Sequence, residues 1–197
     1  MNDVITFDTE EMSGIKVYEP YQLVPEKNPI LKRKAVPFLF DKEQAKEISE
    51  RLKATITKTR AFGVAAPQCG LPYRIFTIGA EGEYTTFFNP EIVSVSKETV
   101  VMDEGCLSYA FLVLSVVRPK SVTISFQNED GEQKVLAFDG LSARIILHEY
   151  DHLEGITFDM VAKPLALKMG LKKREKSMRN FARQLIAQRK LQNEIPR

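Results

Sequence analysis

Both histidines of the chain lie in the stretch HEYDH, residues 148–152, and their spacing constrains the fold more than any other feature. Residues four apart share one face of an α-helix, so His148 and His152 can bind one metal ion if this stretch is helical. Glu149 beside them can take a proton from a water molecule, as in the H-E-x-x-H helices of metallohydrolases. The surrounding sequence LSARIILHEYDHLEG predicts a buried helix that ends at Gly155, a residue favoured just after a helix. Two structural histidines are the alternative, but the chain has no third histidine, and the close grouping favours a metal site.

A metal ion held by two histidines needs a third protein ligand and an open position for water. The better candidate is Cys106, in the stretch DEGCLSYAF, where a glycine-containing turn is expected between two strands. A thiolate is a strong ligand for divalent ions, although free cysteines are often buried and inert. Glu175 is the alternative, because thermolysin-like peptidases use a glutamate as their third ligand. It lies in a strongly basic part of the chain, so the sequence favours Cys106.

The remaining pattern predicts an α+β fold built mainly of antiparallel strands. A helix is expected to begin at Asp41, which can cap it together with Gln44. Its apolar residues recur at helical spacing: Ala45, Ile48, Leu52 and Ile56. Segment 61–72 is rich in small residues and predicts a turn, β-type stretches follow it, and NEDG at 128–131 is typical of a hairpin. We therefore expect antiparallel sheets around a central metal-binding helix, with one helix before the strands and a C-terminal helix after them.

Length and composition predict one domain over residues 1–197. The apolar share of 44% and the charged share of 27% are ordinary for a globular protein. No stretch approaches the ~20 apolar residues of a membrane span. The N-terminal stretch MNDVITFDTEEMSG is acidic and lacks an apolar core, which argues against a targeting signal and favours a cytoplasmic protein. In that compartment Cys69 and Cys106 are not expected to form a disulfide.

Charge is distributed unevenly along the chain. Residues 163–197 hold 11 Lys or Arg and two acids, a net charge of +9, whereas residues 1–162 hold 17 bases and 24 acids, a net charge of −7. The tail is expected to form a basic helical extension of the same domain, starting near Pro164. An approximate apolar stripe supports a helix here: Leu167, Leu171, Met178, Phe181 and Leu185.

Three short motifs, taken in order, resemble those of the peptide deformylases. They are AFGVAAPQ (61–68), EGCLS (104–108) and HEYDH (148–152), matching that family's G-x-G-x-A-A-x-Q, E-G-C-x-S and H-E-x-D-H patterns. Each motif alone is weak or shared with other proteins, but the three together are highly specific. The resemblance covers most of residues 28–180. It implies a hydrolase that removes the N-formyl group from nascent polypeptides starting with formylmethionine and releases formate.

The resemblance also implies roles for single residues. Cys106, His148 and His152 correspond to the metal ligands, and Glu149 corresponds to the general base that activates water and then protonates the leaving amine. The side-chain amide of Gln68 and the backbone N–H of Leu107 correspond to the donors that stabilise the oxyanion. The family uses one divalent ion, with Fe(II) as the expected ion and Zn, Ni or Co able to occupy the same ligands.

The substrate side of the site follows from the same resemblance. Gly63 corresponds to the position where the substrate backbone binds like a strand, and the lack of a Cβ suits such close approach. Apolar residues in or near the matched methionine pocket are Phe62, Met102, Leu141 and Ile145. The chain departs from the family pattern at Ala61, at Leu147 and in the stretch YAFLVL after EGCLS. These departures concern substrate preference more than the reaction.

The expected partners are nascent formyl-Met polypeptides, with no membrane and no DNA. The basic tail predicts docking to ribosomes, because some deformylases dock through a C-terminal helix and phosphates attract Lys and Arg. Seven basic residues are the expected contacts: Lys172, Lys173, Arg174, Lys176, Arg179, Arg183 and Arg189. Two alternatives remain: a zincin-type metallopeptidase that uses the same helix, and an inactive ribosome- or RNA-binding module. The presence of Gln68 and Cys106 with the HEYDH residues argues against both.

Overall fold

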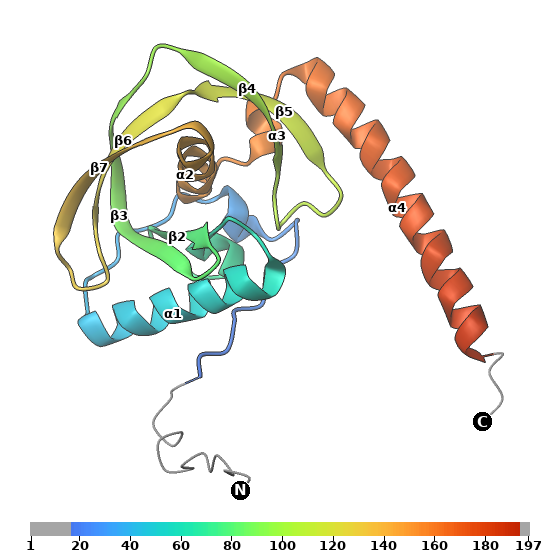
Figure 1. Ribbon diagram of the computed structural model, residues 1–197, viewed down its shortest axis with the longest axis horizontal. Coiled ribbons are helices and arrows are strands. Elements are labelled where there is room, and N and C mark those ends of the chain that lie inside the picture. The colour runs from blue at the N-terminus through green and yellow to red at the C-terminus, as the bar shows by residue number, and fades with distance from the viewer. Residues whose placement is uncertain (1–16, 194–197) are drawn as a thin grey trace, which may run out of the picture.

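The computed structural model describes residues 17–193, and its central element is helix α2 (Gly140–Leu153), which lies among the strands (Figure 1). The helix ends where Gly155 adopts a φ of +72°, after Glu154 as C-cap. A Cβ at Gly155 would lie 2.9 Å from backbone atoms of Lys32 and Arg33. Both the positive φ and this close approach therefore favour glycine at this turn. The acidic N-terminal stretch in which no targeting signal is expected lies outside the described residues.

One face of α2 packs against a five-stranded antiparallel sheet. Its strand order is β1-β2-β3-β6-β7. The strands are β1 (Gly63–Ala65), β2 (Ile75–Ala80), β3 (Glu83–Val95), β6 (Ser121–Gln127) and β7 (Gln133–Asp139). The core between the sheet and the helix is formed by buried apolar side chains, including Phe76, Phe87, Phe126, Ile146 and Leu153. Burial of these side chains is the main contribution to the stability of this part of the fold. The hairpin expected at 128–131 is confirmed as the turn between β6 and β7.

A second, two-stranded sheet covers another side of α2. Strands β4 (Thr99–Gly105) and β5 (Val113–Pro119) pair antiparallel, with Glu104 opposite Leu114. Alternation along β4 points Glu104 inward, where its side chain is buried. Cys106 follows the last residue of β4, so the expected glycine-containing turn between strands is confirmed.

Helix α1 (Lys42–Thr59) packs on the outer side of the five-stranded sheet. Its expected N-cap is confirmed, because the Asp41 carboxylate accepts a hydrogen bond from the Gln44 backbone N–H at 2.8 Å. The predicted apolar stripe is buried, as Ala45, Ile48, Leu52 and Ile56. Two short 3₁₀ helices, η2 (Pro29–Lys32) and η3 (Ala66–Cys69), complete this side of the molecule. The segment expected to be only a turn contains β1 as well as η3.

After the short helix α3 (Phe158–Val161), helix α4 (Pro164–Asn193) leaves the body and projects away from it (Figure 1). The expected C-terminal helix is thus confirmed. Its first turns pack closest to the body, where Leu167 is partly buried and Gly170 is buried, and Arg174 and Phe181 make further contacts with it. The rest of the predicted stripe stays 42–48% exposed, at Leu171, Met178, Phe181 and Leu185. The antiparallel sheets and surrounding helices confirm the α+β fold class. No helix within residues 17–193 is long and apolar enough to cross a membrane.

Candidate metal centre

Three side chains from two elements converge beside α2. Cys106, His148 and His152 each place one ligand atom so that the three atoms lie within 4.8 Å of one another. The Cys106 Sγ lies 3.3 Å from His152 Nε2. His148 and His152 share one face of α2, one turn apart, with ring centroids separated by 5.2 Å. The turn after β4 brings the thiol to that face.

The orientation of His148 is set by Glu104. Its Nδ1 lies 2.9 Å from Glu104 Oε2, which leaves Nε2 directed toward the other two ligand atoms. Glu104 is itself held by two buried guanidinium groups, with Arg118 Nε at 2.6 Å and Arg144 Nη1 at 2.8 Å. Burial raises the pKa of Glu104, but the hydrogen bonds from His148, Arg118 and Arg144 outweigh it and hold that pKa well below the usual range. The carboxylate is therefore a fixed negative charge behind the histidine.

Arg118 extends this network to the far side of α2. Its Nη1 donates to Asp151 Oδ2 at 2.7 Å, so one guanidinium joins β5, the end of β4 and the helix. Arg144 adds hydrogen bonds to the backbone carbonyls of Val116 and Val100. All of these groups are mostly buried, and each charge has an opposite partner, as buried charges require.

The donor set fits a divalent transition-metal ion. One thiolate and two imidazoles are typical ligands for Zn, Fe, Co or Ni, and three protein ligands leave a position open. Burial lowers the pKa of His152 well below its usual value, so its ring is neutral and able to bind a cation. Burial also lowers the pKa of His148, but hydrogen bonds to Cys106 and Glu104 outweigh it and raise the value to about 10. Metal binding there releases a proton.

Glu149 points into the same space without being a ligand. Its Oε2 is buried and has no hydrogen-bond partner among the described residues. Burial raises its pKa to about 7, which is the range of an effective general base at neutral pH. Gly63 faces this carboxylate: a Cβ on residue 63 would lie 2.7 Å from Glu149 Oε1 and 2.9 Å from Ile145 Cγ2. The sequence suggested a substrate contact for this glycine and gave no hint of the contact with Glu149.

Gln68 is held with its amide nitrogen toward the ligands. Its Oε1 accepts from the Ala65 backbone N–H at 2.8 Å, which fixes the direction of the amide. Its Nε2 then lies 3.2 Å from Ser108 Oγ and 3.4 Å from Cys106 Sγ. Leu107 follows Cys106 and lines the same space. The two residues expected to stabilise an oxyanion are therefore both placed beside the ligand group.

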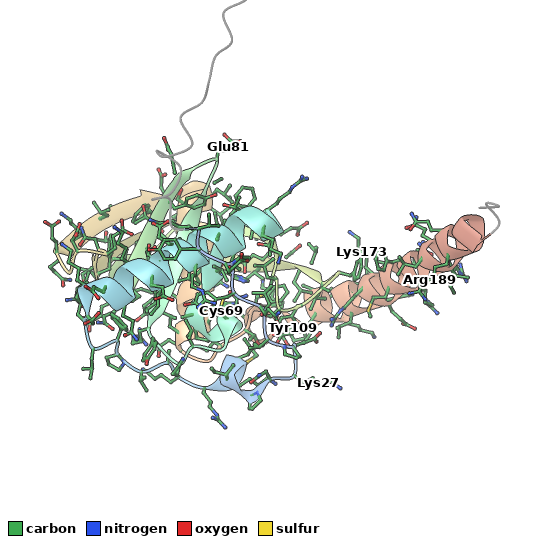
Figure 2. All side chains as sticks on the ribbon, turned by 90° about the horizontal axis from the view of Figure 1, so that it is seen from below. Lys27, Cys69, Glu81, Tyr109, Lys173 and Arg189 are labelled. Atoms are coloured by element: carbon green, nitrogen blue, oxygen red, sulfur yellow. The ribbon has the colours of Figure 1, made fainter. Side chains whose placement is uncertain are left out.

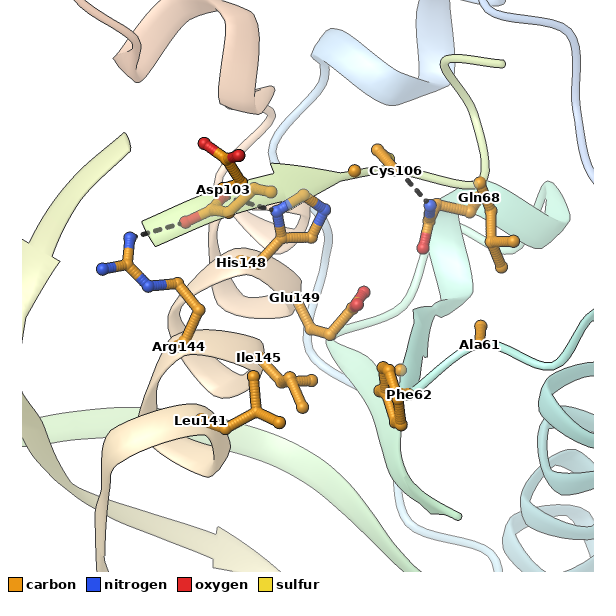
Figure 3. A pocket seen from close by; sticks show the side chains of 14 residues that line it. Ala61, Phe62, Gln68, Asp103, Cys106, Leu141, Arg144, Ile145, His148 and Glu149 are labelled. Atoms are coloured by element: carbon orange, nitrogen blue, oxygen red, sulfur yellow. Dashed lines mark hydrogen bonds and ion pairs between the residues drawn. The ribbon is translucent and has the colours of Figure 1, made fainter. Parts of the chain in front are cut away.

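A cavity of about 410 Å³ opens beside the ligands (Figure 3). Gly63, Phe62, Leu141 and Ile145 line it as expected, with Phe62 and Leu141 more than half exposed at its rim. Met102 lies on β4 and is not among the lining residues. Arg144 is a lining residue that the sequence reasoning missed. Its signal was a single charge inside the otherwise apolar run ARIIL.

Cys69 has a different environment from Cys106. Burial raises the pKa of its thiol to about 12, so it is protonated at neutral pH. It packs with the cluster between α1 and the sheet. Both cysteines are free thiols.

The comparisons with known proteins agree on one family. The model of the polypeptide deformylase family matches residues 20–167. The peptide deformylase of Pseudothermotoga lettingae is 38% identical over 131 residues, which cover 66% of this chain and 76% of that protein. That of Treponema pallidum (strain Nichols) is 37% identical over 123 residues, covering 59% and 76%.

Solved structures give the same result. The peptide deformylase of Thermotoga maritima superposes with a TM-score of 0.72 at 32% identity, covering 74% of this chain and 99% of that one. One from Legionella pneumophila gives a TM-score of 0.75 at 29% identity, covering 83% and 98%. The matched region contains all three motifs, the converging ligand atoms and the cavity, and the chain therefore belongs to the polypeptide deformylase family.

Proposed function

We propose that Cys106, His148 and His152 hold the one divalent metal ion with which this chain removes the N-formyl group from nascent polypeptides. The observation that carries this assignment is the convergence of the three ligand atoms within 4.8 Å, next to a buried carboxylate without a partner. The ion, when bound, supplies Lewis acidity that polarises the formyl carbonyl and lowers the pKa of water toward ~7. Fe(II) is the proposed physiological ion, and Zn, Ni or Co can occupy the same ligands.

Glu149 is proposed as the group that moves protons. Its carboxylate takes a proton from the attacking water, whose oxygen forms a bond to the formyl carbon. When the bond between that carbon and the amide nitrogen breaks, Glu149 returns the proton to the nitrogen. The products are formate and a free N-terminal amine. The close approach of Gly63 to the Glu149 side chain supports this role, because Glu149 also lines the cavity.

Gln68 and Leu107 are proposed to stabilise the negative charge on the formyl oxygen. The amide of Gln68 is already oriented by Ala65, so its nitrogen is held beside Cys106 and Ser108 and needs only to turn an N–H from them to the oxygen as the charge develops. The backbone N–H of Leu107 is the second proposed donor, on the other side of Cys106. Removing one such donor typically costs ~3 kcal/mol of transition-state stabilisation.

The methionine side chain of the substrate is proposed to enter the apolar part of the cavity. Phe62, Leu141 and Ile145 surround that part, and Figure 3 shows Ile145 and Leu141 on one side with Phe62 across from them. Gly63 lies on β1, an edge strand of the sheet, where an extended peptide can add as a further strand.

The direct test is formate release from a formyl-Met peptide, measured together with metal content after anaerobic purification. The wild type should release formate with about one metal ion per chain. Glu149→Gln should keep the metal and lose deformylation, because the amide cannot accept the proton. Loss of the metal in this variant would contradict the role of Glu149, and no formate release by the metal-loaded wild type would contradict the function.

A zincin-type peptidase is not favoured. Its third ligand would have to be Glu175, but that side chain is exposed on α4 and pairs with Arg179 at 3.5 Å. Cys106 occupies the place beside the two histidines instead.

We further propose that the protein is cytoplasmic and that α4 docks to ribosomal RNA. Exposed basic side chains along the helix support this: Lys172, Lys173, Lys176, Arg179, Arg183 and Arg189. Arg174 differs from them, because it is half-buried and paired with Glu26. Met178, Phe181 and Leu185 remain exposed enough to contact a ribosomal protein.

Cosedimentation with ribosomes at low and moderate salt tests the docking. Reversing Lys172, Lys173 and Arg179 to Glu should abolish pelleting while deformylation of a short peptide persists, because phosphate contacts depend on charge and salt. The matched control reverses three exposed lysines of the body, Lys46, Lys58 and Lys97, and should still pellet. Pelleting that ignores both salt and the tail reversal would contradict docking through α4.

A further inference from the structure

The turn after β4 carries several groups of the site and then continues toward α4. We define the Cys106 loop as residues 106–112. It contains Cys106, Leu107 and Ser108, whose hydroxyl contacts Gln68. Two reverse turns shape the loop: the Tyr109 N–H donates to the Cys106 carbonyl at 2.9 Å, and the Leu112 N–H donates to the Tyr109 carbonyl at 3.1 Å. The Ala110 carbonyl between them is left for another donor.

Arg174 on α4 supplies that donor. Its Nε donates to the Ala110 carbonyl at 2.9 Å, and its two terminal nitrogens bind the two carboxylate oxygens of Glu26. A bidentate pair fixes the plane of the guanidinium, so the third N–H is aimed at the loop rather than free to rotate. The hydrogen bond from Arg174 also lowers the pKa of Glu26, so the carboxylate stays charged at neutral pH. Figure 2 shows Tyr109 of the loop and Lys27, the neighbour of Glu26, near the base of α4.

A second contact clamps the tip of the same loop. The rings of Phe111 and Phe181 have centroids 5.3 Å apart. Phe111 has a φ of +63°, in the left-handed region that non-glycine residues adopt only when neighbouring contacts impose it. Helix α4 also approaches β5 very closely, since a Cβ on Gly170 would clash with Leu114 Cδ2 and lie 2.9 Å from the Val113 carbonyl oxygen.

We propose that Arg174 is a positioning residue for deformylation: it holds the Cys106 loop, and with it the Cys106 thiolate and the Leu107 N–H, in the geometry that the reaction needs. The inference rests on the proposed roles of Cys106 and Leu107. The path is short, because Ala110 lies four residues after Cys106 and the loop between them is closed by its own hydrogen bonds. The side of α4 that carries Arg174 and Phe181 therefore serves the catalytic site, apart from any docking by the exposed basic side chains of the same helix.

The test compares Arg174→Gln with Arg174→Lys and with a matched control. Lys168→Gln is the control, because Lys168 lies on the same helix, is exposed, and is not one of the proposed docking residues. For each variant, kcat and KM on a formyl-Met peptide are measured with metal content and thermal stability. The Co(II)-loaded protein also gives an absorption band from the bond between cobalt and the thiolate, which reports the geometry of Cys106 independently of turnover.

Arg174→Gln should lower kcat about tenfold, as loss of a supporting residue around a metal site typically does, with KM nearly unchanged and a shifted cobalt–thiolate band. Arg174→Lys should recover part of kcat, because it keeps the charge and one donor without the bidentate geometry. Lys168→Gln should match the wild type in every measurement.

If the Gln variant unfolds, Gly170→Ala provides the second test, since it forces α4 away from β5 and so draws Arg174 from the loop without changing the Arg174 side chain itself. It should shift the same band and lower kcat. Wild-type kcat and an unshifted band in either folded variant would overturn the proposal, as would loss of activity that only follows loss of folded protein. Absence of formate release by the wild type would instead overturn the proposed function, and the cobalt band would still report on Arg174.

Discussion

Gly63 and Glu149 face each other so closely that a β-carbon on residue 63 would lie 2.7 Å from Glu149 Oε1. The contact joins the edge strand β1 to α2, the helix that carries the two histidines, and it leaves no room for a side chain between residue 63 and the carboxylate. A single methyl group is therefore enough to test whether the position of this carboxylate matters.

Gly63→Ala should lower kcat by at least tenfold while the metal content stays at the wild-type level. The methyl group pushes Glu149 and Ile145 out of place, and a misplacement of about 1 Å can cost 10²-fold in rate. Formate release and metal analysis on one preparation check this. Wild-type turnover would show that the Glu149 carboxylate tolerates displacement.

The two cysteines form a matched pair of variants. Cys106→Ala should lose most of its bound metal and all activity, because two imidazoles alone hold the ion weakly. Cys69→Ala should retain both, since Cys69 packs between α1 and the sheet and is protonated at neutral pH. Metal analysis of the two variants shows which cysteine is the ligand. If Cys69→Ala is the variant that loses the ion, Cys106 is not the ligand.

Glu104→Gln should weaken both the fold and the metal site. It removes the carboxylate that Arg118 and Arg144 share with His148, which leaves buried charge without its partner and costs about 3–5 kcal/mol of unfolding free energy. Metal affinity should fall 10- to 100-fold, as typical for loss of a group that orients a ligand.

Urea unfolding and metal titration measure these two effects. The control is Glu98→Gln, which breaks an exposed pair with Lys120 and should change neither quantity. Equal stability of the two variants would mean that the buried network contributes nothing to the fold.

The iron-loaded protein should lose activity in air, whereas the nickel- or cobalt-loaded protein should persist. A thiolate beside Fe(II) is exposed to oxidation by oxygen chemistry at the metal, and Ni(II) does not start that chemistry as readily. Activity followed over time under air and under argon, with each metal, provides the measurement. Identical decay of the iron and nickel forms would count against Fe(II) chemistry at this site.

Local patterns predicted the elements whose determinants lie within a few residues. The i, i+4 spacing of the histidines, the Asp41 cap and the NEDG turn each specify their own structure, and all three are confirmed. The sequence did not predict strand β1, because its three residues, Gly63–Ala65, are all buried and therefore show no alternation of apolar and polar residues. It becomes a strand only by pairing with β2, which no local signal shows.

The sequence predicted the candidate site residues that lie within or beside the three motifs, but not the charge network around them. Glu104, Arg118, Arg144 and Asp151 are 7 to 47 residues apart in the sequence, and their mutual charge pairing appears only once β4, β5 and α2 are packed. The same holds for Arg174, which reads in the sequence as one more base of a charged tail. Its burial and its pairing with Glu26 come from tertiary contacts alone.

The ion pair between Glu26 and Arg174 joins residues 148 positions apart. Contacts of such long sequence separation close the largest loops, and the entropy of that closure delays them in folding. The strands and α2 that position Cys106 and the two histidines are joined by shorter loops, so they are expected to pack before Arg174 reaches Glu26. In refolding from urea, the tether of the Cys106 loop should therefore form after the rest of the site, so that activity returns later than the bulk of the secondary structure.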